Sequence, residues 1–133
     1  MYLLDTNICI YIINKRPAHI VERIKKLKPS QVKLSAISLG ELEYGASKGS
    51  YRKKNRNALI DFVSAFEITA FTDIDAEVYG IIRADLEKRG QLIGPYDMQI
   101  AAQTITHDLI LVTNNVKEFS RIKKLKIENW LEE

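Results

Sequence analysis

The sequence has a single cysteine and no long hydrophobic segment. Cys9 is its only cysteine, so the chain can form no internal disulfide and no thiolate metal cluster. No apolar run approaches the roughly 20 residues that cross a bilayer, and residues 1–5 lack the basic segment that opens a signal peptide. We therefore expect a cytoplasmic protein without membrane contact, in which oxygen or imidazole would hold any metal ion.

Histidine is scarce as well, and nothing in the composition indicates disorder. His19 and His107 are the only histidines, and their separation fits no metal-ligand spacing. Hydrophobic residues make up 46% of the chain and charged residues 28%, which is ordinary for a globular protein. The length of 133 residues is typical of one domain. We expect residues 1–133 to form a single domain.

Positive charge is modest in sum but concentrated along the chain. The formal net charge is +3, and lysine and arginine gather in runs at residues 25–28, 52–56 and 121–126. Any one such run is most often the solvated face of a helix, but three of them in a short chain favour phosphate binding.

Short apolar runs alternate with helical patterns along the chain. Strands are expected at residues 2–4, 32–37, 68–71 and 109–113, with an edge strand at 125–127. Helices are expected at residues 8–15, 20–27, 38–48, 59–66, 76–88 and 95–105. Such alternation is typical of parallel strands joined by right-handed crossovers. The fold class predicted is α/β, a three-layer α/β/α sandwich with a central, mainly parallel sheet.

Three acids fall near the carboxyl ends of the predicted strands, where sheets of this kind bind ligands. Asp5 ends the first strand, Glu41 lies one turn into the helix after the second, and Asp97 lies in the first turn of the helix that precedes the 109–113 strand. No lysine or arginine lies within four residues of Asp97. Clustered carboxylates suit Mg²⁺ or Mn²⁺, ions that bind substrate phosphates, so the pattern predicts phosphodiester hydrolysis.

Each acid also has a purely structural interpretation. Asp5 is suited to cap a helix, and Glu41 stands three residues after Ser38, the spacing of a capping box. Asp97 would complement a helix dipole, an effect of only about 0.3–1 kcal/mol at an exposed site. That is a weak reason to bury a charge, so the metal interpretation is favoured for Asp97 above all.

The sequence around the acids strengthens the metal interpretation. Four segments carry the signal: Leu-Leu-Asp-Thr-Asn at 3–7, Ile-Ser-Leu-Gly-Glu-Leu-Glu-Tyr-Gly-Ala at 37–46, Gly-Pro-Tyr-Asp at 94–97, and Leu-Val-Thr-Asn-Asn at 111–115. Together, and in this order, they resemble the PIN-domain family, and within it the VapC group of ribonuclease toxins. The resemblance extends over nearly the whole chain.

This resemblance implies a PIN fold, a Mg²⁺ or Mn²⁺ cofactor and hydrolysis of RNA. It also implies a type II toxin–antitoxin system, with a VapB antitoxin encoded beside the toxin, a homodimer and a toxin–antitoxin hetero-oligomer. The RNA implied is tRNA, with initiator tRNA as the first candidate, so that cleavage would inhibit translation.

The family pattern also assigns roles to individual residues. By resemblance, Asp5 and Asp97 are the principal metal ligands, Glu41 is the second catalytic acid and Thr6 supplies a hydroxyl near the metal. These assignments agree with the sheet-edge argument for the three acids.

One position departs from the family pattern. Many PIN domains have a fourth acid two residues after the threonine that ends the late strand, and here that position is Asn115. An amide oxygen still binds a hard cation but carries no charge, so it should weaken any second metal. Glu118 is the alternative acid if the local turn directs it inward.

Two other classes of function remain open from the residues alone. A receiver-like Mg²⁺-binding phosphoacceptor domain also gathers acids at a sheet edge, but it needs adjacent acids after its first strand, where this chain has only Asp5. A catalytically silent RNA-binding module would use the basic runs alone and would leave the buried acids without a purpose.

Overall fold

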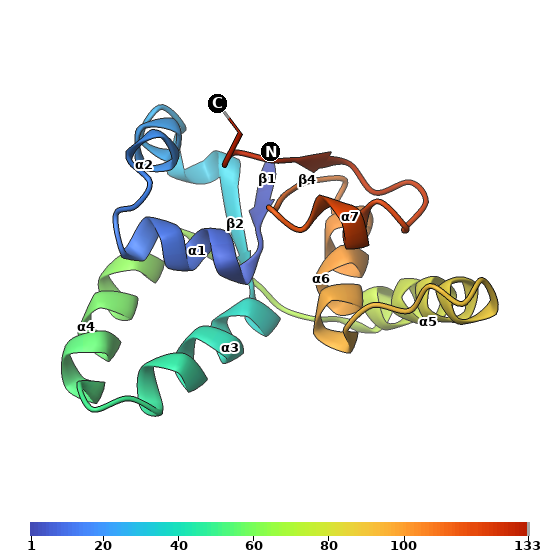
Figure 1. The fold of residues 1–133 in the computed structure, drawn as a ribbon, viewed down its shortest axis with the longest axis horizontal. Coiled ribbons are helices and arrows are strands. Elements are labelled where there is room, and N and C mark those ends of the chain that lie inside the picture. The colour runs from blue at the N-terminus through green and yellow to red at the C-terminus, as the bar shows by residue number, and fades with distance from the viewer. Residues whose placement is uncertain (133) are drawn as a thin grey trace.

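The computed structural model describes residues 1–132 (Figure 1). The strands are β1 (Tyr2–Leu4), β2 (Val32–Ser35), β3 (Glu67–Thr69), β4 (Ile110–Val112) and β5 (Ile127–Glu128). The helices are α1 (Thr6–Ile13), α2 (Ala18–Lys25), α3 (Ala36–Ser47), α4 (Arg52–Val63), α5 (Asp73–Lys88), α6 (Pro95–Thr106) and α7 (Val116–Phe119), with a short 3₁₀ turn at Pro29–Gln31. Within these residues, no helix is long and apolar enough to span a membrane.

All five strands are parallel, in the order β3-β2-β1-β4-β5. β1 lies in the middle, and Leu4 stands level with Leu34 of β2 and Val112 of β4. The carboxyl ends of the three inner strands therefore meet at one edge. The α/β prediction with a mainly parallel central sheet is confirmed.

Helices cover both faces of the sheet (Figure 1). Leu3 and Leu4 are adjacent in β1 and fully buried, so their side chains enter opposite layers. Leu3 packs with residues of α5 and α6, whereas Leu4 packs with residues of α1 to α4. This division gives the predicted three-layer sandwich.

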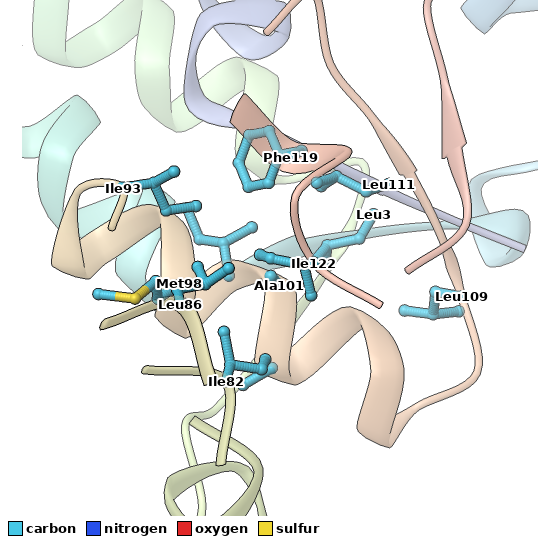
Figure 2. Packing of buried hydrophobic residues seen from close by; sticks show 12 residues of the cluster. Leu3, Ile82, Leu86, Ile93, Met98, Ala101, Leu109, Leu111, Phe119 and Ile122 are labelled. Atoms are coloured by element: carbon cyan, nitrogen blue, oxygen red, sulfur yellow. The ribbon is translucent and has the colours of Figure 1, made fainter. Parts of the chain in front are cut away.

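The cluster around Leu3 is drawn in Figure 2, where Phe119 of α7 lies near Leu111, while Met98 of α6 and Ile93, just before that helix, lie on the side of the cluster away from Leu109. Phe119 is 1% exposed, so the short helix α7 is fixed by its aromatic side chain. The opposite cluster contains Trp130, which is also 1% exposed and meets the Tyr2 ring edge-on at 5.2 Å between centroids.

The predicted capping box at Ser38 and Glu41 is wrong. The helix begins earlier, at Ala36, and its N-cap is Ser35, whose hydroxyl accepts the Ile37 N–H at 2.9 Å. The strand ends directly at this serine, so the first of two suitable serines caps the helix. Glu41 consequently lies in the second turn of α3, where its side chain makes no cap.

Most other boundaries agree with prediction to within a few residues. The largest difference is α4, which begins at Arg52 and ends at Val63, so it contains the basic run and leaves Phe66 outside. The helix α7 was not predicted, because four residues are too few for a periodic pattern.

Candidate active site

Asp5 lies at the carboxyl end of the central strand and is held by contacts from two sides. Its Oδ1 accepts the Ile8 N–H at 2.9 Å, which makes Asp5 the N-cap of α1. Its Oδ2 accepts a short hydrogen bond from the Thr113 hydroxyl. Asp5 is only 6% exposed, and burial raises its pKa although both hydrogen bonds oppose that change; the charge of Glu41 raises it further.

Glu41 is joined to the first helix through Thr6. The Thr6 hydroxyl donates to Glu41 Oε1 at 2.8 Å and lies 3.1 Å from the hydroxyl of Ser38. This contact replaces the backbone cap that the sequence indicated, and it directs the Glu41 carboxylate toward the edge where Asp5 lies.

Asp97 stands in the first turn of α6, near enough to Glu41 and Asp5 for their charges to act on it. Burial raises its pKa to about 6, and the negative charges of Glu41, Asp5 and Glu118 add to that effect in decreasing order. Within residues 1–132, no ion pair with lysine or arginine relieves any of these four carboxylates. The structure thus gathers unneutralised negative charge at one point.

A buried glutamine fixes the helix that carries Asp97. Gln103 is completely buried, donates from Nε2 to the Thr69 carbonyl at 3.1 Å and accepts a short hydrogen bond from the Ser35 hydroxyl. Because Ser35 and Thr69 end adjacent strands, Gln103 ties α6 across the edge of the sheet. Asp97 lies on the same helix, so its position depends on this anchor.

Asn115 and Glu118 lie on the other side of the site and contact each other. Asn115 Nδ2 donates to Glu118 Oε2 at 3.0 Å, and the Asn115 N–H donates to the Thr113 hydroxyl at 2.9 Å. Glu118 is near enough for its charge to raise the pKa of Asp97. The turn therefore brings Glu118 to the acids and orients it through Asn115.

Comparison with known proteins identifies the family. The PIN domain pattern matches residues 2–125. The chain belongs to the PIN-domain family. It is 43% identical over 131 residues to "Ribonuclease VapC2" from Rickettsia felis, with 98% of each chain covered, and 41% identical over 130 residues to "tRNA(fMet)-specific endonuclease VapC" from Salmonella typhimurium, with 97% of each covered.

A solved structure shows the same fold. This PIN-domain chain matches the crystal structure of VapBC2 from Rickettsia felis bound to a DNA fragment from their promoter, with a TM-score of 0.91 and 42% identity. The match covers 97% of this chain and 98% of that one. The chain is therefore a VapC-type member of the PIN-domain family, as its motifs predicted.

The donor set of this PIN domain suits a hard divalent cation, although its acids do not enclose one by themselves. Among residues 1–132, no group of three or more Asp, Glu, His or Cys side chains is arranged so that it could hold a metal ion by itself. Mg²⁺ is commonly held by one or two carboxylates, with waters and substrate phosphates in the remaining positions. Carboxylates that have no cationic partner within residues 1–132, with Glu41 on the wall of a hollow, fit that mode of binding.

Two side chains that help to position the candidate acids of this PIN domain were given no role by the sequence argument. Thr113 directly follows β4 as Asp5 directly follows β1, so the rule about strand ends could have identified it. Gln103 had no such signal, because a glutamine within a helix is ordinary until its burial is known.

The basic runs of this PIN domain are partly neutralised by neighbours. Arg56 pairs with Glu43 at 3.1 Å, and Lys126 pairs with Asp108 at 3.0 Å. Lys54 instead lines a hollow that also includes Glu41. Phosphate binding by these runs stays a prediction.

Proposed function

We propose that this chain is a Mg²⁺- or Mn²⁺-dependent endoribonuclease, the toxin of a VapBC-type type II system. The observation that carries the proposal is the group of Asp5, Glu41, Asp97 and Glu118 at one sheet edge. Burial, and after it the charges of the other three acids, raise the pKa of Asp97 to about 6, and within residues 1–132 no lysine or arginine forms an ion pair with any of the four. Such an arrangement costs stability in the absence of a bound cation. A divalent ion would offset that cost.

Asp5 and Asp97 are the proposed metal ligands, with Glu41 as the second catalytic acid. A divalent ion, when bound, polarises a phosphoryl oxygen and lowers the pKa of a water. PIN nucleases generally depend on divalent metals. Asn115 and Glu118 are proposed as auxiliary groups, which replace the fourth acid of many PIN domains.

The contacts of the chain itself support these roles. Hydrogen bonds from Ile8 and Thr113 fix both oxygens of Asp5. The Thr6 hydroxyl holds one Glu41 oxygen, which leaves the other to orient an attacking water. Above pH 6 Asp97 is ionised and available as a ligand. The proposed chemistry is hydrolysis of an RNA phosphodiester to a 5′-phosphate and a 3′-hydroxyl.

The substrate and partners are carried over from the relatives. The Salmonella relative is named for tRNA(fMet), so tRNA, and initiator tRNA first, is the proposed substrate, whose cleavage would inhibit translation in the cytoplasm. The Rickettsia structure is a VapBC complex, so a VapB-type antitoxin is the proposed inhibitor. A homodimer and a toxin–antitoxin hetero-oligomer are proposed on the same basis.

Cleavage of RNA by three aspartate variants tests the proposal. Asp5→Asn and Asp97→Asn should each abolish Mg²⁺-dependent cleavage while retaining a cooperative unfolding transition. Asp61→Asn is the control, because Asp61 is exposed on α4. Full activity in either active-site variant would remove the assignment. Absence of cleavage by the wild-type chain, with phosphate transfer to an aspartate instead, would favour the receiver-like alternative.

A further inference from the structure

A groove of about 890 Å³ opens beside the acids, along helix α3. Thr6 and Glu41 belong to its wall, so it is continuous with the proposed active site. Its other lining residues that matter here are Gly40, Tyr44, Gly45, Lys48 and Tyr96. The volume is within the range of ligand pockets in proteins.

Two aromatic rings in this groove are unusually exposed. Tyr44 is 67% exposed and Tyr96 is 57% exposed, and each comes from a helix that also carries one of the acids. The Lys48 ammonium lies 5.2 Å from the centroid of the Tyr44 ring, and within residues 1–132 no acid pairs with it. Exposed aromatic rings with a free cation nearby are the elements that bind single-stranded nucleic acid.

Two glycines keep the groove open. Gly40 and Gly45 lie inside α3, where glycine is less favourable than alanine. A Cβ atom added at either position would meet no atom within 4 Å, so packing within the chain does not require glycine there. The bare helix surface leaves room for the close approach of another molecule to the backbone.

We propose that this groove binds an unpaired nucleotide of the RNA substrate, next to the bond that is cleaved. The base stacks on Tyr44 or Tyr96, and Lys48 contacts a backbone phosphate. This inference rests on the proposed function, because it places the nucleotide beside Glu41. RNA is read mainly at unpaired bases that stack on aromatic side chains, which the two tyrosines provide. They bind the nucleotide in this proposal, while the acids perform the chemistry.

The aromatic contribution is tested with a short single-stranded RNA whose cleaved bond has been mapped. Tyr44→Leu and Tyr96→Leu should each lower kcat/KM, and at least one of them by about 5- to 100-fold, the range expected for loss of one base stack. Tyr44→Phe and Tyr96→Phe keep the ring and should cleave nearly as wild type does. Thermal unfolding should be unchanged, since both side chains are exposed.

The base itself can be removed in the same experiment. An RNA with an abasic residue next to the cleaved bond should be a poorer substrate for the wild type. The variant that lacks the ring on which the missing base would stack should show no further loss on that RNA. Equal proportional losses in wild type and both variants would show that neither ring contacts the base, and would overturn the proposal.

Charge and space are tested with separate variants. Lys48→Gln should weaken RNA binding and reduce its salt dependence, whereas Lys88→Gln, in the last turn of α5 and outside the lining of the groove, should not. Gly40→Ala should raise the melting temperature, and Gly40→Leu should lower kcat/KM because its side chain occupies the groove. Wild-type kinetics in Gly40→Leu would contradict the proposal.

These outcomes are separable from failure of the proposed function. If the wild type cleaves no RNA with Mg²⁺, the proposed function itself fails. If the wild type cleaves and both tyrosine-to-leucine variants cleave equally well, only the subsite fails. If those variants cleave normally but no longer bind the antitoxin, the groove belongs to the protein partner, and the nucleotide proposal is wrong.

Discussion

Replacing Asp97 with asparagine should stabilise the metal-free protein while it abolishes activity. Asp97 faces Glu41, Asp5 and Glu118, and burial together with these charges raises its pKa from 3.8 to about 6. The folded state therefore binds a proton at Asp97 more tightly than the unfolded state does. Above pH 6 the folded protein carries the full cost of an ionised Asp97, and asparagine, which does not ionise, avoids that cost.

The size of the effect follows from the pKa. Without any correction for solvent, a rise of the pKa from 3.8 to about 6 lowers the free energy of unfolding by about 3 kcal/mol. Asp97 is half-buried, so solvent screening reduces this to about 1–1.5 kcal/mol. For a chain of this length, the melting temperature of Asp97→Asn should exceed that of the wild type by about 3–6 °C at pH 7.5.

Thermal unfolding from pH 4 to pH 8 with a chelator present checks this reasoning. The difference in melting temperature between Asp97→Asn and the wild type should be small near pH 4. It should grow as pH rises to about 6 and stay constant above that. Adding Mn²⁺ should narrow it, because the ion stabilises the wild type more than the variant. A variant less stable than the wild type at pH 7.5, or a difference independent of pH, would refute the reasoning.

Three further substitutions and one inhibitor test follow from the same contacts. Glu41→Gln can still accept the Thr6 hydroxyl, so folding should barely change while cleavage falls about 100-fold or more, as measured by initial rates at saturating Mg²⁺. Thr113→Val removes the donor to Asp5 and the acceptor for the Asn115 N–H, and urea titration should show a loss of about 1–3 kcal/mol. Gln103→Leu removes the acceptor of the Ser35 O–H and the side-chain donor to the Thr69 carbonyl, at a similar cost, and should reduce cleavage as well because α6 carries Asp97. The product of the adjacent frame should co-purify with the chain, reach the acids with an arginine or lysine, and rescue growth; unaffected growth on expression of the active enzyme alone would count against a toxin.

The strands and their parallel arrangement were predictable because short, mainly apolar runs alternate with helical patterns, and β1 and β4 are each followed by a polar residue at the carboxyl edge. Asp5 and Asp97 were predictable for the same reason, since strand ends and first helical turns are visible in sequence. The position of Glu41 was predicted, but its contact was not. Its partner, Thr6, is 35 residues away, and such a pairing depends on how α1 and α3 pack.

Burial and long-range hydrogen bonds account for what the sequence did not show. The choice between Ser35 and Ser38 as N-cap depended on where β2 ends, a matter of one or two residues. Gln103 acquires its role only when its amide meets the ends of β2 and β3. The inward direction of Glu118 depends on α7, which Phe119 anchors in the core.

Calorimetric titration of Mn²⁺ into the wild type and Asp97→Asn, at pH 6 and pH 8, tests the central claim most directly. A metal ligand must be deprotonated to bind, and the pKa of Asp97 is about 6. The wild type should therefore release protons when it binds Mn²⁺ at pH 6 and release few at pH 8. Asp97→Asn should bind Mn²⁺ more weakly, and its proton release should not be larger at pH 6 than at pH 8. Binding of Mn²⁺ by Asp97→Asn as tight as that of the wild type would contradict the assignment of the acids as a metal centre.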